Sequence, residues 1–409
     1  MKRIYLDYAS LTPIDPRVLR DMRRYSSSEF ANPSSIYKEG VASKKAMESA
    51  RSGVAGFLHA HPDEIVFTGG GTEANNLAIV GALKAAKKNG IEKPHLVISN
   101  IEHSSILELA AELERTEEAE VTRIAVNDLG LIPVDELKKA IKFNTVLVSI
   151  MTVNNEIGTI QPIREIAKAI RQAKKSFNRK EGDSLMVYPL FHTDASQAAL
   201  FLDLNVEQLG VDLMTLDGGK VYGSRGIGAL FVKRDTSIEP IIYGGGQERG
   251  LRSGTENVPA IMGLAKALEL ATATRAAESQ RISGLRACFV EGLKKIRWNI
   301  SINPVAPDVR SSRYIIYDIT QAPHILNVSI PGIDNEFFTL QLDARGIAVS
   351  TKSSCLRDED ESYVLKAIGA DSRTAIRFSF GRFTKKPDIA KALKEIRAIL
   401  GKPAKILQK

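Results

Sequence analysis

Short apolar runs alternate with stretches of helical periodicity from about residue 60 to residue 235. The apolar runs predict strands, and they are EIVFT, LVISN, TVLVSIM, MVYPLF, DLMTL and GIGALFVK. Helical patterns lie between several of them, such as TEANNLAIVGALKAA and PIREIAKAIRQAKK. Strands that alternate with helices in this way are typical of an α/β layer built on a mainly parallel sheet.

The pattern changes after this region. Residues 236–258 are rich in glycine and polar side chains without periodicity, which predicts a long loop with a functional or interface role. A long helical pattern follows (AIMGLAKALELATATRAAE), and strands are predicted at HILNVSI and AIRFSF. We therefore expect a large domain over residues 15–262 and a smaller α/β domain made of residues 1–14 and 263–409.

Composition narrows the class of protein. Of the 409 residues, 44% are hydrophobic and 25% are charged, which is typical of a globular protein. No apolar run reaches the roughly 18 residues that span a bilayer, and no apolar signal core follows the N-terminus. We expect a cytoplasmic protein without a membrane partner. The net charge of +8 raises the possibility of a nucleic-acid partner, but basic residues mix with acidic ones in stretches such as DELKKAIK, so a solvated surface is the favoured interpretation.

The chain has two cysteines, too few for a disulfide framework or a zinc cluster, and no metal site is predicted. Cys288 lies in a helical pattern, RISGLRACFVEGL, and is expected in the core. Cys355 lies in a polar stretch, STKSSCLRDEDES, where a lone thiol is a candidate reactive group.

Three polar motifs directly follow predicted strands, so they should gather at the edge of the sheet where parallel strands end. The first is TGGGTE, residues 68–73, which opens a helix. Glycines and amides at a helix start can bind phosphate, with the Thr72 hydroxyl as an added donor; the alternative is a plain turn between strand and helix. No Gly-Lys-Ser/Thr follows, so the motif is not a Walker loop.

The other two motifs are HTDASQ, residues 192–197, and DGGKVYG, residues 217–223. Asp194 in the first could hold a protonated pyridine nitrogen or cap a helix. Lys220 in the second, flanked by glycines, could form a Schiff base or lie in a surface turn.

With these motifs the chain resembles the cysteine desulfurases, within the class V aminotransferase group of fold-type I pyridoxal-phosphate enzymes. The similarity runs almost end to end, through YLDYASLTP, FANPSSIYKEG, FTGGGTEANN, IEHSSIL, VNNEIGTIQPI, HTDASQ, GGGQERGLRSGTENVPA, HILNVSIPG and IRFSFGRFT. The resemblance implies the fold of that group, with a large domain around a mainly parallel sheet and a smaller α/β domain.

The resemblance also implies the residues that bind pyridoxal 5'-phosphate. Lys220 would carry the cofactor as a Schiff base, Asp194 would pair with the pyridine nitrogen, and Gln197 would bond the ring hydroxyl. Thr72 and the backbone around Gly71 would bind the phosphate. Thr255 would reach the phosphate of the neighbouring subunit in a homodimer.

A catalytic set is implied in the same way. His103 would stack on the ring and assist proton transfer, Asn155 would contact cofactor or substrate, and Arg377 would clamp the substrate carboxylate. The thiolate of Cys355 would take the sulfur of L-cysteine, leaving L-alanine and a persulfide. The sulfur would pass to an acceptor protein, such as an iron–sulfur scaffold or a relay for tRNA thiolation.

The chain departs from the family's pattern before the lysine. The family usually has Ser-x-His there, and both side chains bind the phosphate, whereas this chain has Asp217 and Gly219. Two unit charges about 4 Å apart repel by roughly 4 kcal/mol at an effective dielectric constant near 20. Asp217 must therefore turn away, bind a proton or be offset by a cation. One hypothesis is that the amides of Gly218 and Gly219 replace the missing donors, with Arg225 supplying charge.

The stretch around Cys355 departs as well, with Lys352 where the family has glycine and an acidic run, LRDEDES, after the cysteine. Lys352 would lower the pKa of the thiol and the acidic run would raise it. Two alternatives to a desulfurase stay open: another enzyme of the class, such as a selenocysteine lyase or an aminotransferase, and a catalytically silent homologue that acts as a binding protein.

Overall fold

The computed structural model describes residues 3–181, 188–305, 321–351 and 361–401. Within them the larger sheet has seven strands in the order β2-β8-β7-β6-β5-β3-β4. All neighbours are parallel except β8, which is antiparallel to β2 and to β7. The strands are β2 (Ile65–Thr68), β3 (His95–Ser99), β4 (Glu120–Ile124), β5 (Thr145–Ser149), β6 (Leu190–Asp194), β7 (Leu213–Asp217) and β8 (Gly228–Val232). The prediction of a mainly parallel sheet is confirmed.

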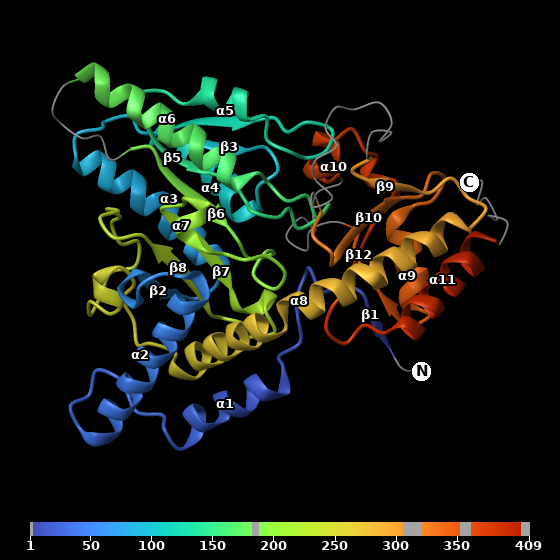
Figure 1. Cartoon of the computed structure of the whole chain (residues 1–409), viewed down its shortest axis with the longest axis horizontal. Coiled ribbons are helices and arrows are strands. Elements are labelled where there is room, and N and C mark those ends of the chain that lie inside the picture. The colour runs from blue at the N-terminus through green and yellow to red at the C-terminus, as the bar shows by residue number, and fades with distance from the viewer. Residues whose placement is uncertain (1–2, 182–187, 306–320, 352–360, 402–409) are drawn as a thin grey trace.

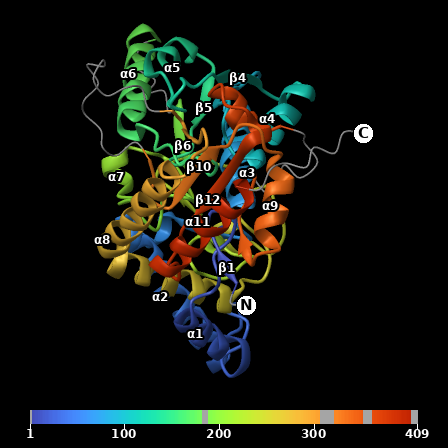
Figure 2. The ribbon, with the colours of Figure 1, turned by 90° about the vertical axis from the view of Figure 1, so that its right-hand side faces the viewer.

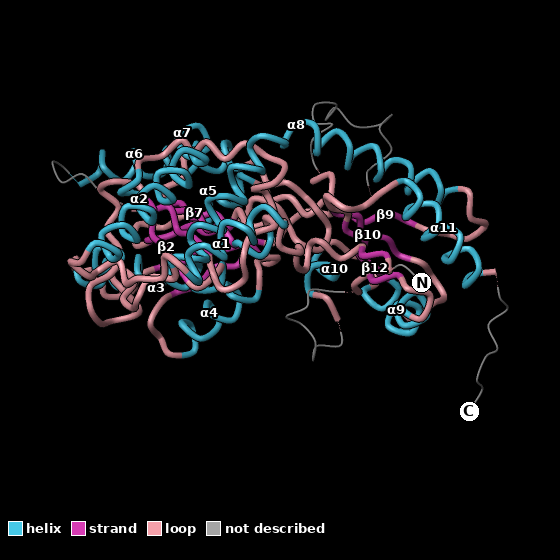
Figure 3. Tube along the Cα trace, turned by 90° about the horizontal axis from the view of Figure 1, so that it is seen from below, coloured by secondary structure: helices cyan, strands magenta, loops and turns pink. Residues whose placement is uncertain are grey.

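Both faces of this sheet are covered by helices, which is why most of its strands are apolar runs. Alternate side chains of β3 enter different cores: Leu96 and Ile98 pack with α3 (Gly71–Lys88) and α4 (Ser104–Arg115). Val97 packs on the opposite face, in the core that includes residues of α2 (Lys38–Leu58), α5 (Val134–Ala140), α6 (Ile163–Glu181) and α7 (Val206–Leu209). Figure 3 shows the strands between these two helical layers.

A second, smaller β-structure lies at the other end of the molecule (Figures 1 and 2). Its antiparallel sheet has the order β12-β10-β9, and a parallel pair β1-β11 ties the N-terminal segment to it. The strands are β1 (Ile4–Tyr5), β9 (Ser301–Asn303), β10 (Ile325–Ser329), β11 (Ile347–Ala348) and β12 (Ala375–Ser379). The helices α9 (Asn335–Asp343) and α11 (Lys386–Leu400) supply side chains to its core. Two further α-helices are α1 (Pro16–Ser27) and α10 (Tyr363–Ala367).

One long helix, α8 (Val258–Lys294), joins the two parts. Its side chains from Ala260 to Ala271 pack into the core of the larger sheet, and those from Ile282 to Leu293 pack into the core of the smaller one. The expected boundary between residues 262 and 263 falls inside this helix. The division into 15–262 and 1–14 with 263–409 stays a prediction.

The prediction that Cys288 is a core residue is wrong. Cys288 lies on α8 but is exposed, because the buried face of this half of the helix consists of Ile282, Leu285, Phe289 and Leu293. Successive helical residues point about 100° apart, so the neighbour of a buried residue readily faces solvent. Among the described residues, no helix is both long enough and apolar enough to cross a membrane.

Candidate active site

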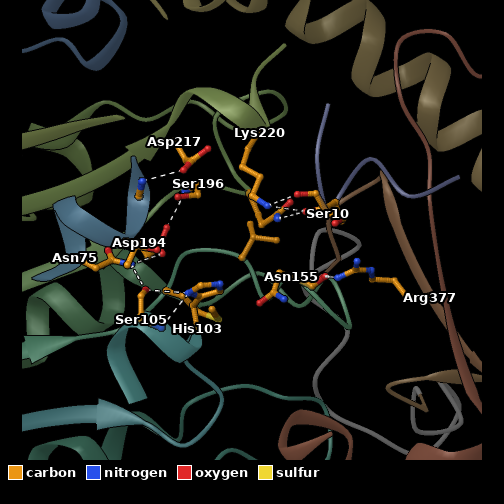
Figure 4. A pocket seen from close by; sticks show the side chains of 16 residues that line it. Ser10, Asn75, His103, Ser105, Asn155, Asp194, Ser196, Asp217, Lys220 and Arg377 are labelled. Carbon is orange, nitrogen blue, oxygen red and sulfur yellow. Dashed lines mark hydrogen bonds between the residues drawn. The ribbon is translucent and has the colours of Figure 1, made fainter. Parts of the chain in front are cut away.

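A cavity of about 230 Å³ lies where the strands of the larger sheet end, and segments far apart in sequence line it (Figure 4). Most residues singled out from the sequence contribute to it: Gly71, Thr72, His103, Asn155, Asp194, Gln197, Lys220 and Arg377. Thr255 does not line it and is exposed. Cys355 lies outside the described residues.

Lys220 ends the short 3-10 helix η2 (Gly218–Lys220), which begins directly after β7. Its Nζ donates hydrogen bonds to the carbonyl oxygens of Ser10 at 2.5 Å and Ala9 at 3.2 Å. Glycine is required before it, since a Cβ on Gly218 would lie 2.6 Å from the carbonyl oxygen of Ser224. The amine is thus held at the cavity wall by the N-terminal segment of the chain.

A hydrogen-bond network joins Asp194, at the end of β6, to His103 before α4. Asn75 Nδ2 donates to Asp194 Oδ2 at 2.8 Å and to Ser105 Oγ at 2.9 Å, and Ser105 Oγ lies 2.9 Å from His103 Nδ1. The Ser196 amide donates to the other oxygen of Asp194 at 2.9 Å. These contacts fix the carboxylate and the imidazole relative to each other (Figure 4).

The same network sets the proton position on His103. The Ser105 amide donates to His103 Nδ1 at 3.1 Å, and this contact caps the start of α4. A nitrogen that accepts an amide hydrogen carries no proton, so the imidazole bears its proton on Nε2.

Gln197 is held from two sides. Its Nε2 donates to the Ala9 carbonyl at 2.8 Å, so its Oε1 accepts from His324 Nε2 at 3.2 Å. His324 stacks on Phe201 with 4.4 Å between ring centroids. Burial first, and the charge of Arg377 second, lower the pKa of His324 to about 3. His324 therefore acts as a neutral donor that orients the amide of Gln197.

Arg377, on β12, is only 1% exposed. Its Nη2 binds Asp7 Oδ1 at 2.9 Å and its Nη1 donates to the Asn155 carbonyl at 2.8 Å. Its Nε is buried and has no hydrogen-bond partner among the described residues. The guanidinium therefore retains a donor for a further acceptor.

At the opposite end of the cavity, Asp217 does not turn away. Its Oδ2 accepts from the Gly71 amide and its Oδ1 from the Gly219 amide, both at 2.8 Å. The Gly218 amide donates to the Ile227 carbonyl at 2.9 Å. The hypothesis that the Gly218 and Gly219 amides replace the missing phosphate donors is therefore wrong, because in this structure both amides already donate to other acceptors. Arg225 is exposed and does not line the cavity.

Sequence reasoning missed several residues that shape the cavity: Asp7, Ser10, Asn75, Ser105, Ser196 and His324. Asn75 offered a usable signal, because it lies four residues after Gly71 and so shares its face of the helix. Ser10 contributes through its carbonyl, which has no signature in a side-chain pattern.

A doubly covered, mainly parallel sheet with a lysine and a carboxylate at its strand ends defines an α/β protein with its site at the sheet edge. The chain belongs to the aminotransferase class-V family, whose model matches residues 4–391. It is 39% identical over 407 residues to the cysteine desulfurase IscS of Dictyoglomus turgidum, covering 98% of this chain and 96% of that one.

Solved structures agree with this assignment. A NifS-like protein superposes with a TM-score of 0.85 at 31% identity, covering 98% of this chain and 99% of that one. A structure described as SspA in complex with cysteine gives a TM-score of 0.76 at 34% identity, covering 92% and 98% of the two chains.

The class-V family consists of pyridoxal-phosphate enzymes, and the two ends of the cavity fit that cofactor differently. Asp194 is 8% exposed, and among the described residues its side chain is bound only by the neutral donors of Asn75 and Ser196. A protonated pyridine nitrogen would complete this carboxylate with a charge-assisted hydrogen bond. The ring end of the cavity thus fits. At the phosphate end, Asp217 already binds the Gly71 and Gly219 amides.

Proposed function

We propose that this chain is a pyridoxal-phosphate-dependent cysteine desulfurase, which converts L-cysteine to L-alanine and transfers the sulfur to Cys355. The observation that supports the proposal is the convergence on one cavity of an amine, a buried carboxylate, an imidazole and a buried guanidinium, from Lys220, Asp194, His103 and Arg377. The similarity to cysteine desulfurases over nearly the whole chain supports the same conclusion.

In this proposal Lys220 binds the cofactor covalently, Asp194 holds the pyridine nitrogen and Gln197 bonds the ring hydroxyl. The cofactor, when bound, supplies an electron sink that labilises bonds at the substrate's α- and β-carbons. The rigid contacts of Asp194 and Gln197 with Asn75 and His324 keep both side chains oriented for this task.

Arg377 binds the carboxylate of L-cysteine. A planar guanidinium matches a carboxylate, and burial strengthens the interaction because little water competes for it. Asn155 accepts a hydrogen bond from Arg377 through its carbonyl and lines the cavity with its side chain, so it can contact substrate or cofactor.

His103 carries a proton on Nε2 and exchanges it with the substrate. The thiolate of Cys355 attacks the substrate sulfur. The Cβ–S bond breaks, a proton takes the place of sulfur on Cβ, and an S–S bond forms. L-cysteine and a thiol thereby give L-alanine and a persulfide, without an external oxidant.

The proposal includes a homodimer and a sulfur-acceptor protein, such as an iron–sulfur scaffold. Thr255 is exposed and lies outside its own chain's cavity, which agrees with a role toward the phosphate of a neighbouring subunit.

The test is release of alanine and sulfide from L-cysteine in the presence of a thiol reductant. Cys355→Ser should abolish both products, whereas Cys288→Ser, the matched control on an exposed helix face, should leave both unchanged. Lys220→Ala should abolish the visible absorbance of the bound cofactor. Undiminished release by Cys355→Ser would reject Cys355 as the sulfur carrier, transamination of L-cysteine without release of alanine and sulfide would indicate an aminotransferase, and a wild-type protein without a cofactor band would indicate a silent homologue.

A further inference from the structure

The amides of the glycine-rich turn before α3 are bound by the chain's own carboxylates. Gly71 and Gly219 donate to the two oxygens of Asp217, each at 2.8 Å, and Gly69 donates to Glu73 Oε2 at 2.9 Å. Both Asp217 oxygens act as acceptors, as an ionised carboxylate allows. Asp217 is thus an internal anion at a helix start, the position where external anions bind in other proteins.

Within the described part of the chain, Asp217 forms no ion pair with a basic side chain. Arg252, a basic side chain on the adjoining loop, forms an ion pair with Glu73 at 2.8 Å. Among the described residues, the lysine and arginine side chains that line the cavity are Lys220 and Arg377, which donate to Ser10 and Asp7. In the part of the chain that the structure describes, the contacts at the turn around Gly71 thus involve the carboxylates of Asp217 and Glu73 and the cation of Arg252, which is already paired with Glu73.

The turn around Gly71 also leaves little space, in addition to having its amide donors already bound. A Cβ built on Gly71 would lie 3.2 Å from Asp217 Oδ2, which shows how closely the carboxylate packs against the helix start. A phosphate group that approached the Gly71 amide would meet an oxygen that already accepts from this amide and carries charge of the same sign.

We propose that Asp217 competes with the phosphate of pyridoxal phosphate for the amides at the start of α3. Cofactor affinity then depends mainly on the ring end of the cavity, and the phosphate adds little. This inference rests on the proposed function and deepens it, because it assigns to this chain a weak dependence on the cofactor's phosphate group.

The experiment compares pyridoxal phosphate with pyridoxal, which lacks the phosphate. Dissociation constants for the apoprotein are measured from the absorbance band of the lysine-bound form, and their ratio isolates the phosphate's contribution. Hydrogen bonds to a charged group contribute about 1.5–3 kcal/mol, so Asp217→Ser should increase the ratio of Kd for pyridoxal to Kd for pyridoxal phosphate by about 10-fold or more. Asp217→Asn, which keeps one acceptor oxygen, should give a smaller increase.

Glu73→Gln is the matched control, because it also removes one negative charge at the same turn but leaves the Gly71 amide untouched. Its ratio should stay within about 3-fold of the wild type. Equal effects of Glu73→Gln and Asp217→Ser would overturn the proposal in favour of a general charge effect. An unchanged ratio in Asp217→Ser, with folding verified by circular dichroism, would also overturn it.

Failure of the proposed function gives a different result. If neither pyridoxal phosphate nor pyridoxal produces a lysine-bound absorbance band in the wild type, Lys220 does not bind the cofactor, and the proposed function fails before the ratio is measured. If both produce the band and the wild-type ratio already exceeds about 100-fold, the phosphate is bound strongly and only the role of Asp217 is rejected.

Discussion

The cavity has anion-binding groups at two ends, and at each end a different aspartate of the chain is bound to them. At one end Asp7 pairs with the buried guanidinium of Arg377. At the other end Asp217 accepts from the amides of Gly71 and Gly219. The guanidinium at the first end is charged and the amides at the second end are neutral. The two ends should therefore respond differently when a second anion binds.

At the cationic end a second carboxylate can be accommodated. Arg377 carries a full positive charge in an environment with little water, and its Nε has no partner among the described residues. Asp7 compensates a charge whose burial would otherwise be costly. At the amide end the donors are neutral, and Asp217 has already engaged Gly71 and Gly219, so a further anion meets repulsion. The chain's own aspartate stabilises the first site and competes in the second.

The largest effect is expected from Arg377→Ala. Removing one partner of a buried ion pair costs about 3–5 kcal/mol, and the lower end applies because the Asp7 side chain keeps 18% exposure. If Arg377 binds the substrate carboxylate as proposed, its loss should also decrease kcat/KM for L-cysteine by about 100-fold or more. Urea denaturation and steady-state kinetics measure the two effects.

Arg377→Lys separates them. A lysine retains the charge opposite Asp7 but not the planar fork, so stability should largely recover while KM stays high. If the lysine variant bound L-cysteine as well as the wild type does, charge alone would account for substrate binding at this end.

A smaller effect is expected from Asp7→Asn, which keeps the shape of the side chain and removes its charge. Arg377 loses its compensating partner, so the free energy of unfolding should fall by about 2 kcal/mol. The uncompensated guanidinium should attract the substrate carboxylate more strongly and decrease KM for L-cysteine by about 3-fold or more. A higher KM would contradict the view that the charge of Asp7 weakens the attraction between Arg377 and the substrate carboxylate. It would instead indicate that Asp7 positions Arg377.

The control for Asp7→Asn is Asp343→Asn. Asp343 pairs with Arg3 at the surface, where the two side chains are 50% and 58% exposed. Exposed pairs contribute about 0–1 kcal/mol, so this variant should be nearly neutral in stability and in KM.

The fold could be predicted from the sequence where a strand is buried on both faces of the sheet. Strands β3, β5, β6 and β8 are buried along their whole length, and the sequence shows them as apolar runs. Strand β4 was missed because it is an edge strand whose side chains, such as Glu120 and Arg123, are mostly not buried. Strands β1 and β11 contain two residues each, too few for any periodicity.

The site was predictable to the extent that it follows strand ends. Asp194 and Lys220 were expected at one edge of the sheet because the motifs that contain them follow apolar runs, and the structure brings both into one cavity. The contact between Asp7 and Arg377 spans 370 positions and had no local signal. The orientation of the Asp217 side chain depends on the backbone of the turn that follows it. The sequence therefore indicated that Asp217 conflicts with a phosphate, but not that it would bind the Gly71 and Gly219 amides.

The carboxyl of Glu102 offers a third case: it directly precedes the N-cap of α4, but among the described residues it forms no ion pair and accepts from Ser99 Oγ and the Met151 amide rather than from an amide of the helix start. It is fully buried, and burial raises its pKa to about 8, although hydrogen bonds from Ser99 Oγ and the Met151 amide act in the opposite direction. A carboxyl without a compensating charge retains its proton, whereas Asp7 is balanced by Arg377.

Compared over a single pH unit, the smallest effect is a slope of the free energy of unfolding against pH. Since the pKa of Glu102 is higher in the folded state than the ordinary value of 4.5, the folded state holds the extra proton between pH 4.5 and about 8. The unfolded state binds fewer protons in this window, so the free energy of unfolding should fall as pH rises, by at most about 1.4 kcal/mol per pH unit. Above about pH 8 this contribution to the slope should vanish.

The variant Glu102→Gln, which mimics the protonated carboxyl, should remove this contribution to the slope. Urea denaturation of the two proteins between about pH 5 and pH 8 measures the difference, in which the titration of other groups cancels. Parallel curves for the two proteins would mean that Glu102 is ionised when folded, and that burial alone does not separate it from the two aspartates.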